Sequence, residues 1–165
     1  MASVTLRGNP FSTNGELPAV GSAAPDFTLT GNDLGDVTLA SLAGQQVILN
    51  IFPSIDTPTC AQSVRSFNEK AAARAGTTVI CVSEDLPFAM SRFCGAEGIE
   101  NVKVASAFRS DFTESYGLEL ADGPLRGLAA RAVVVLDESG NVTYTQLVGE
   151  IADEPDYDAA LAALG

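Results

Sequence analysis

Residues 47–60 read Val-Ile-Leu-Asn-Ile-Phe-Pro-Ser-Ile-Asp-Thr-Pro-Thr-Cys, an apolar run followed directly by turn and helix-start signals. The run Val47–Phe52 is nearly continuously apolar, which is typical of a strand buried on both faces of a sheet. Pro53 ends that strand, and Thr57-Pro58 supplies a preferred N-cap followed by a preferred first helical residue. The stretch therefore predicts a buried strand that leads straight into a helix, with Cys60 in the first helical turn.

Further elements follow on both sides of this stretch in the chain of 165 residues. The helix that holds Cys60 is expected to run from about Thr57 to Ala75 and to end at Gly76. Residues Val4–Val20, with turn signals at Asn9-Pro10 and Asn14-Gly15, predict an N-terminal β-hairpin. Other strands are expected at Asp26–Thr30, Val79–Val82, Val102–Ala105, Ala132–Leu136 and Val142–Leu147, and other helices at Leu86–Cys94, Asp111–Tyr116 and Asp156–Leu164.

The order of these elements indicates an α/β fold in a single domain, residues 1–165. Parallel strands joined by crossover helices on one side are followed by an antiparallel hairpin, whose tight turn is residues 138–141. No repeat, low-complexity tract or linker interrupts the chain. This order resembles the thioredoxin fold, with a central mixed sheet flanked by helices and an added N-terminal β-hairpin.

The net charge of −12, from nine Lys and Arg against 21 Asp and Glu, leaves no basic surface that would bind nucleic acid. So acidic a chain would also be repelled by anionic lipid. No apolar run approaches the roughly 18 residues of a membrane helix, and Met1–Pro10 lacks the apolar stretch of a secretory signal. We therefore expect a cytoplasmic protein with no membrane or nucleic-acid partner.

The chain contains no histidine. This absence excludes Ser-His-Asp and Cys-His hydrolases, His-ligated metal sites and histidine general bases. Three cysteines, at positions 60, 81 and 94, are too few for a four-cysteine zinc site. A persistent structural disulfide is not expected in a reducing cytosol. The cysteines are therefore left with packing or redox catalysis, and no metal or other cofactor is expected.

Cys60 has two interpretations. In the first turn of a helix its sulfur lies near unpaired backbone N–H groups and the positive end of the helix dipole, and both favour the thiolate. Without histidine, electrostatic activation of this kind is the route that remains to a reactive cysteine, and an arginine is the natural cation to assist it. The alternative is that Cys60 packs as a small apolar residue at a helix start.

The spacing Pro53, Thr57 and Cys60, Pro-x-x-x-Thr-x-x-Cys, resembles the active-site motif of the peroxiredoxin family. Residues 108–135, with Ala-Asp-Gly-Pro-Leu at 121–125, look like the bacterial thiol peroxidase branch of that family, and so do residues 154–157. The resemblance implies that Cys60 is the peroxidatic cysteine, that Thr57 hydrogen-bonds the bound peroxide and that Pro53 shields the thiolate from water.

The resemblance also selects a cation. Composition does not choose among Arg109, Arg126 and Arg131, and an arginine at a strand start could simply be solvated. The family motif selects Arg131 as the guanidinium beside the sulfur. Peroxide cleavage puts negative charge on the leaving oxygen, and fixed donors from Thr57 and Arg131 would stabilise that charge.

A sulfenic acid on Cys60 must be resolved by a second thiol, and two are available. Cys81 lies in an apolar strand where burial raises its pKa, which favours a packing role. Cys94 falls in the last turn of a short predicted helix, before Gly95, where fraying costs little. The resemblance selects Cys94 as the resolving cysteine of an intramolecular pair, and we expect both cysteine segments to unwind locally during the cycle.

The resemblance thus implies a thiol-specific peroxidase that reduces hydrogen peroxide and organic hydroperoxides through a sulfenic acid and an intramolecular disulfide. It also implies recycling by thioredoxin and a homodimer. A thioredoxin-fold redox sensor or disulfide exchanger without peroxidase turnover is the alternative. A non-enzymatic binding scaffold would leave the set Pro53, Thr57, Cys60 and Arg131 unexplained.

Overall fold

The apolar run at 47–52 forms a central strand of the sheet. In the computed structural model, which describes residues 1–71 and 74–165, strand β5 (Gln46–Ile51) pairs in parallel with β6 (Thr77–Ser83) and antiparallel with β8 (Ala132–Leu136). Residues 47–51 are all buried, since side chains cover both faces of the strand. The prediction of a strand buried on both faces is confirmed.

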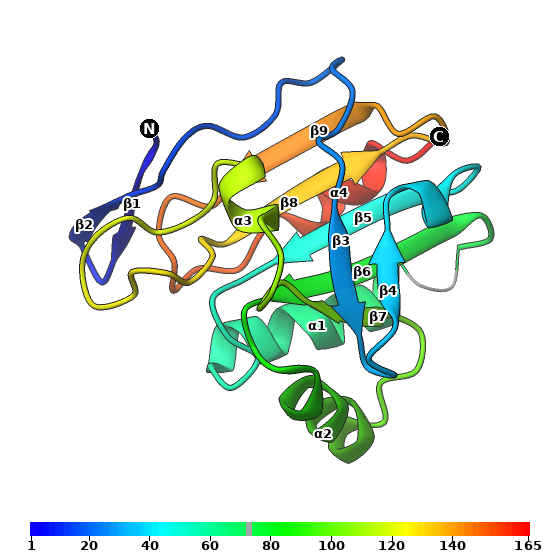
Figure 1. Cartoon of the computed structure of the whole chain (residues 1–165), viewed down its shortest axis with the longest axis horizontal. Coiled ribbons are helices and arrows are strands. Elements are labelled where there is room, and N and C mark those ends of the chain that lie inside the picture. Colours follow the sequence, from blue (N-terminus) through cyan, green and yellow to red (C-terminus); the bar gives the residue numbers. More distant parts are fainter. Residues whose placement is uncertain (72–73) are drawn as a thin grey trace.

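In the described residues, seven strands form the main sheet, in the order β4-β3-β7-β6-β5-β8-β9 (Figure 1). The pairs β5–β6 and β6–β7 are parallel, and the pairs toward both edges are antiparallel, so the sheet is mixed as predicted. The remaining strands are β3 (Thr28–Gly31), β4 (Asp36–Thr38), β7 (Lys103–Ser106) and β9 (Val142–Leu147).

Three helices pack against one face of this sheet. They are α1 (Pro58–Lys70), α2 (Pro87–Glu97) and α4 (Tyr157–Ala162), and their buried side chains share one apolar cluster with Ile48 and Val133. The opposite face is covered by the N-terminal segment, by the short helices η1 (Ala40–Leu42) and α3 (Phe112–Ser115) and by the long loop before β8. Among the described residues, no helix has the length and apolarity needed to cross a bilayer.

The N-terminal hairpin consists of β1 (Ser3–Leu6) and β2 (Asn9–Ser12) and is shorter than the predicted range 4–20. Its two-residue turn is Arg7-Gly8, in which both residues have positive φ, as a tight hairpin turn requires. Asn9-Pro10 lies within β2 instead of forming a turn. The pair β1–β2 is a sheet of two edge strands, so a proline without an N–H is tolerated there.

The hairpin is fixed against the loop that follows β9. Thr5 donates its N–H to the carbonyl of Gly149 at 2.7 Å and accepts from the N–H of Ile151 at 2.7 Å. The Glu150 carboxylate accepts from the N–H groups of Gly8 and Ala152, which lowers its pKa to about 2. These contacts hold the hairpin against the loop after β9, on the side of the molecule where β1 and β2 lie (Figure 1).

Two predicted helix ends are wrong. Helix α1 ends at Lys70 and not at Ala75, and residues 72–73 of that prediction lie outside the described residues. Helix α2 continues through Gly95 and ends at Glu97, and its C-cap residue Gly98 has a φ of 65°, the left-handed conformation that glycine adopts freely. A glycine inside a helix costs only about 1 kcal/mol, which the packing of α2 offsets.

Residues 31–36, which follow the predicted strand Asp26–Thr30, are only in part a loop. The ends of this stretch belong to β3 and β4, which pair as an antiparallel hairpin, and β4 was not predicted. Three residues are too few for an alternating pattern to identify a strand. The hairpin β8–β9, predicted with its turn at 138–141, is confirmed, and Gly140 in that turn has a φ of 81°.

Candidate active site

Cys60 is the third residue of α1 and is fully buried. Thr57 is the N-cap residue with extended backbone, and Pro58 is the first helical residue, so the predicted helix start is confirmed. The Thr57 hydroxyl does not cap the helix, however. It donates to the carbonyl of Ser54 at 2.9 Å. The first-turn N–H groups therefore have no side-chain cap, and the positive end of the dipole lies beside the sulfur.

Arg131, just before β8, is the arginine that reaches the sulfur. Its Nη2 lies 3.2 Å from Cys60 Sγ, and its Nε donates to the carbonyl of Ile151 at 2.8 Å. The side chain is only 2% exposed, and among the described residues Nη1 has no hydrogen-bond partner. The guanidinium is thus in direct contact with the Cys60 sulfur in a site from which water is largely excluded.

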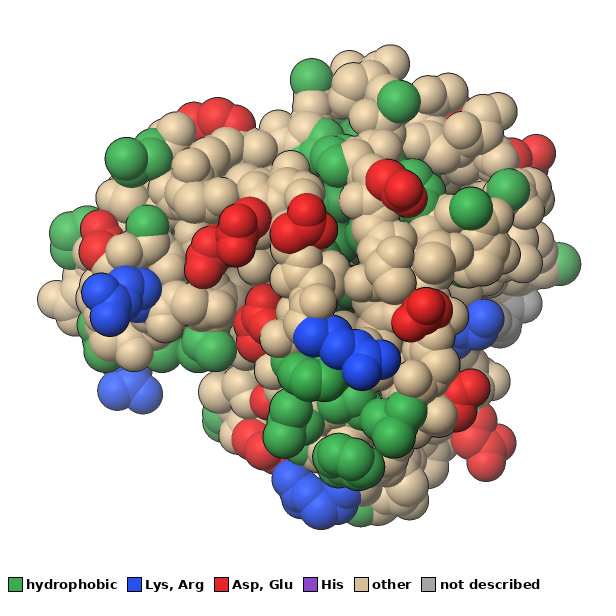
Figure 2. All heavy atoms as spheres, viewed as in Figure 1, with side chains coloured by type: hydrophobic (Ala, Val, Ile, Leu, Met, Phe, Trp, Pro, Cys, Tyr) green, Lys and Arg blue, Asp and Glu red, His purple; other side chains and the backbone are tan. Residues whose placement is uncertain are grey.

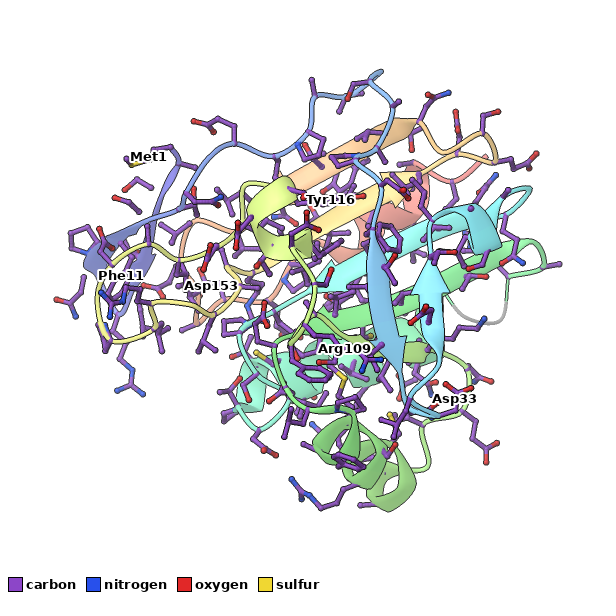
Figure 3. All side chains as sticks on the ribbon, viewed as in Figure 1. Met1, Phe11, Asp33, Arg109, Tyr116 and Asp153 are labelled. Atoms are coloured by element: carbon purple, nitrogen blue, oxygen red, sulfur yellow. The ribbon has the colours of Figure 1, made fainter. Side chains whose placement is uncertain are left out.

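The other two candidate arginines lie away from Cys60. Arg109, labelled in Figure 3, donates through Nε to the Thr30 hydroxyl and stacks over the Phe108 ring. Arg126 is an exposed residue of the loop before β8. Of the three arginines among which composition could not choose, Arg131 is thus the one in contact with Cys60.

A cleft of about 540 Å³ opens beside this pair. Pro53, Thr57 and Arg131 line it, so three of the predicted residues of the peroxidatic site come together around one space. Cys60 is fully buried and does not line the cleft, but it contacts Arg131, which does. Its outer walls come from the hairpin and from the loop before β8, and their apolar members are Leu6, Phe11, Pro124, Leu125 and Leu128. Figure 3 shows Phe11 on the hairpin and Asp153 on the loop after β9 on this side of the molecule.

The loop after β9 connects the walls of the cleft. The Ile151 carbonyl holds Arg131, and the Ala152 carbonyl accepts from the Thr59 hydroxyl in the first turn of α1 at 2.9 Å. The same loop binds the hairpin through Thr5. One short segment therefore sets the positions of the cation, the helix start and the hairpin wall.

A carboxylate that the sequence analysis did not identify holds the loop before α1. Asp85 accepts from the Ser54 hydroxyl at 2.8 Å, from the Ile55 N–H at 2.6 Å and from the Ser83 hydroxyl at 2.5 Å. A signal for it was present in the sequence. Asp85 follows the strand parallel to the one before Cys60, and the carboxyl ends of adjacent parallel strands meet at one edge of a sheet.

Cys94 lies in the last turn of α2 and is half-buried. It packs against the apolar cluster that contains Cys60, and its burial raises the pKa of its thiol. All three thiols are free. The structure thus describes a state in which Cys94 is a free thiol that is not bonded to Cys60.

Cys81 lies within β6 with no exposed surface. Burial raises the pKa of Cys81 to about 12, while the Asn50 amide, 3.6 Å from its sulfur, acts in the opposite direction. A thiol so buried stays protonated at neutral pH and cannot act as a nucleophile. The packing interpretation of Cys81 therefore agrees with its environment.

Because the Cys81 thiol is buried, we expect the free energy of unfolding to fall at alkaline pH. Its folded pKa, about 12, exceeds that of an unfolded thiol, about 8.5, so its contribution is complete below pH 8.5 and declines as the pH rises toward 12. Between pH 9 and 10 the free energy of unfolding should fall by about 1 kcal/mol more in the wild type than in Cys81→Ala. Urea denaturation measures this difference. If the free energy of unfolding fell equally with pH in the two proteins, this prediction would be wrong.

The sequence profile of the Redoxin family matches residues 19–161. The chain belongs to the redoxin family. It is 66% identical over 165 residues to the thiol peroxidase of Mycobacterium tuberculosis, covering 100% of this chain and 99% of that protein. The thiol peroxidase of Corynebacterium glutamicum is 57% identical over 164 residues, with 99% of each chain covered.

Solved structures of redoxins have the same architecture. A peroxiredoxin-like protein from Aquifex aeolicus superposes with a TM-score of 0.93 at 40% identity, covering 98% of this chain and 95% of that one. Together with the full-length relatives, this likeness confirms the predicted thiol peroxidase branch, the thioredoxin-like mixed sheet and the oxidoreductase activity on peroxide.

Proposed function

We propose that Cys60 of this redoxin is the nucleophile that reduces hydrogen peroxide and organic hydroperoxides. The observation that carries the proposal is the 3.2 Å contact between Arg131 Nη2 and Cys60 Sγ beside an open cleft. A buried cation and a helix N-terminus converge on one sulfur, which is how a thiolate is stabilised in the absence of a histidine base.

The thiolate attacks one oxygen of the hydroperoxide, so that an S–O bond forms as the O–O bond breaks. Cys60 is oxidised to a sulfenic acid, and the second oxygen leaves and takes up a proton as an alcohol or water. Nη1 of Arg131, which has no hydrogen-bond partner in the part of the chain that the structure describes, is available to stabilise charge on the leaving oxygen. The Thr57 hydroxyl already donates to Ser54, so its oxygen can accept from the peroxide O–H. Pro53, buried at the cleft wall, limits the access of water.

Replacing Arg131 with methionine should slow oxidation of Cys60 by peroxide about 10²–10³-fold, because a donor to the leaving oxygen and a neighbour of the thiolate are both lost. The second-order rate constant from peroxide competition kinetics measures this loss. Arg131→Lys is the matched control for charge. A lysine keeps the charge but cannot hold Ile151 and the sulfur at once, so it should recover only part of the rate. A rate unchanged in Arg131→Met would remove the guanidinium from the reaction.

We further propose that Cys94 resolves the sulfenic acid by closing an intramolecular disulfide with Cys60 and releasing water. Burial raises the pKa of Cys94, so its thiol becomes a competent nucleophile once α2 opens and exposes it. The positions of the two cysteines support this route, since each lies in a terminal turn of its helix while Cys81 is held in a central strand.

Thioredoxin is the proposed reductant of this disulfide, and the cytoplasm, where thiols stay reduced, is the proposed compartment. The test is peroxide-dependent consumption of NADPH coupled through thioredoxin and its reductase. Catalytic consumption would support a peroxidase cycle. If peroxide oxidised Cys60 in a single turnover no faster than it oxidises a free thiolate, the chain would instead be a redox sensor or disulfide exchanger.

A homodimer is also proposed. Two large apolar side chains at the start of α2 are strongly exposed, Leu86 at 52% and Phe88 at 68%, and so is Phe108, at 43%, in the loop after β7. Figure 2 shows hydrophobic side chains gathered over α2, with basic side chains above and below them. An exposed apolar patch of this kind is typical of an interface. Sedimentation velocity tests the proposal, and a species of 17.0 kDa at all concentrations would contradict it.

A further inference from the structure

We propose that Asp85 is a positioning residue, which holds the loop before Cys60 in its reactive shape and couples release of that loop to the opening of α2. The inference rests on the proposed cycle of Cys60 and Cys94 and adds a residue to it. Asp85 does not line the cleft, so its effect would act through the residues it binds.

The first half of the inference concerns the loop at residues 53–57. The Asp85 carboxylate accepts from the Ser54 hydroxyl through one oxygen and from the Ile55 N–H through the other. Ser54 in turn holds Thr57, because its carbonyl accepts from both the N–H and the hydroxyl of that residue. The carboxylate thus fixes the orientation of a cleft hydroxyl two hydrogen bonds away.

The second half concerns α2. Asp85 directly precedes Leu86, the N-cap residue of that helix. Its own backbone is anchored to the sheet, since its carbonyl accepts from the Ser106 hydroxyl and its N–H donates to the Ser83 hydroxyl. Asp85 therefore links the two cysteine segments. It is hydrogen-bonded to the loop before Cys60, and it directly precedes the helix that carries Cys94.

A carboxylate is the group that this position requires. Three donors converge on it, and the N–H of Ile55, a buried residue, can only donate. A carboxylate offers acceptors alone, whereas an asparagine turns an NH₂ group toward at least one donor. The other link between the loop and α2, from Arg92 to Asp56 at 3.0 Å, is exposed on both sides and is screened by water.

Removing the hydrogen bonds of the Asp85 carboxylate should change the rates of peroxide reduction and of disulfide closure in opposite directions. Attack on peroxide should become slower, because Thr57 and the helix start lose their fixed positions, and misplacement by about 1 Å can cost about 10²-fold. Disulfide closure should become faster, because the loop and the start of α2 open more readily. A general loss of stability would not produce this pair of opposite changes.

The experiment compares Asp85→Ala and Asp85→Asn with Asp137→Ala. Asp137 is a matched control, because its carboxylate also accepts from two backbone N–H groups, those of Ser139 and Asn141, in the β8–β9 turn. In Asp85→Ala, oxidation of Cys60 by hydrogen peroxide should slow about 10–100-fold. Closure of the disulfide should accelerate several-fold, and overoxidation of Cys60 at high peroxide should decrease. Asp85→Asn should show smaller changes of the same signs, and Asp137→Ala none.

Amide exchange of the reduced protein supplies a readout that does not depend on peroxidase activity. Asp85→Ala should exchange faster both at residues 54–57 and in the first turn of α2, while Asp137→Ala should not. The inference would be overturned if Asp85→Ala left the rates of Cys60 oxidation and disulfide closure unchanged, or slowed both alike. Unchanged amide exchange in the first turn of α2 would also overturn it. Failure of the wild type to consume peroxide would instead refute the proposed function, and the exchange experiment would still decide the role of Asp85.

Discussion

Cys60→Ser is expected to abolish peroxide reduction while leaving the fold intact. The serine oxygen has no accessible anion at neutral pH, even with the Arg131 guanidinium at the distance seen for the sulfur. The loss should reach about four orders of magnitude or more, as for removal of other nucleophiles. Because the substitution changes little volume at a fully buried site, the sheet and α1 should keep their native packing.

Competition with a second peroxidase for limiting peroxide measures this loss directly, which suits a chain without tryptophan. Cys81→Ala is the matched control, since it removes an equally buried thiol from the neighbouring strand and should keep the wild-type rate. Circular dichroism of both variants establishes that they are folded. Substantial peroxidase activity in Cys60→Ser would show that another group is the nucleophile.

Cys94→Ser should reduce one equivalent of peroxide at close to the wild-type rate and then stop. No internal thiol would remain to resolve the sulfenic acid on Cys60, because the Cys81 thiol is buried in the sheet and stays protonated. With further peroxide the sulfenic acid should proceed to sulfinic and sulfonic acids. Steady-state turnover coupled to thioredoxin should therefore fall to background, while the first oxidation stays fast.

Intact-mass measurements follow the oxygen atoms added to Cys94→Ser, and a non-reduced digest of the oxidised wild type identifies the bridge. We expect one disulfide, between Cys60 and Cys94 of a single chain. Amide exchange should become faster around both cysteines on oxidation, with β5 and β6 unchanged. A bridge between chains, a bridge through Cys81, or turnover of Cys94→Ser at the wild-type rate would each exclude this cycle.

The central part of the fold could be predicted because its signals are local. The apolar run at 47–52 had to form a buried strand, and Thr57-Pro58 set the start of α1 within one residue of its observed position. The turn at 138–141 likewise carried its own glycine. Where one short segment contained both the apolar pattern of an element and the residues that end it, the sequence was sufficient to predict that element.

Boundaries that depend on packing were predicted less well. Gly95 looked like a helix end, but α2, which packs against the sheet, continues to Glu97 and is capped by Gly98. The N-terminal hairpin was placed correctly, yet its turn was not, because the register of β1 and β2 is fixed with the docking of Thr5 on the loop after β9. Such contacts join residues that no local pattern relates.

The amino-acid sequence by itself determined the chemistry that this chain can perform. Without histidine, and with Cys60 at a helix start, redox reaction of a thiolate was the catalytic route left open. Only the tertiary structure decided which groups surround that sulfur. Arg131 lies 71 positions away in the chain and Asp85 reaches Ser54 across 31, and contacts at such separations arise from the pairing of strands. Helix propensity and turn signals act within a few residues, so they cannot specify these partners; the folded sheet specifies them because it brings the ends of β5, β6 and β8 together.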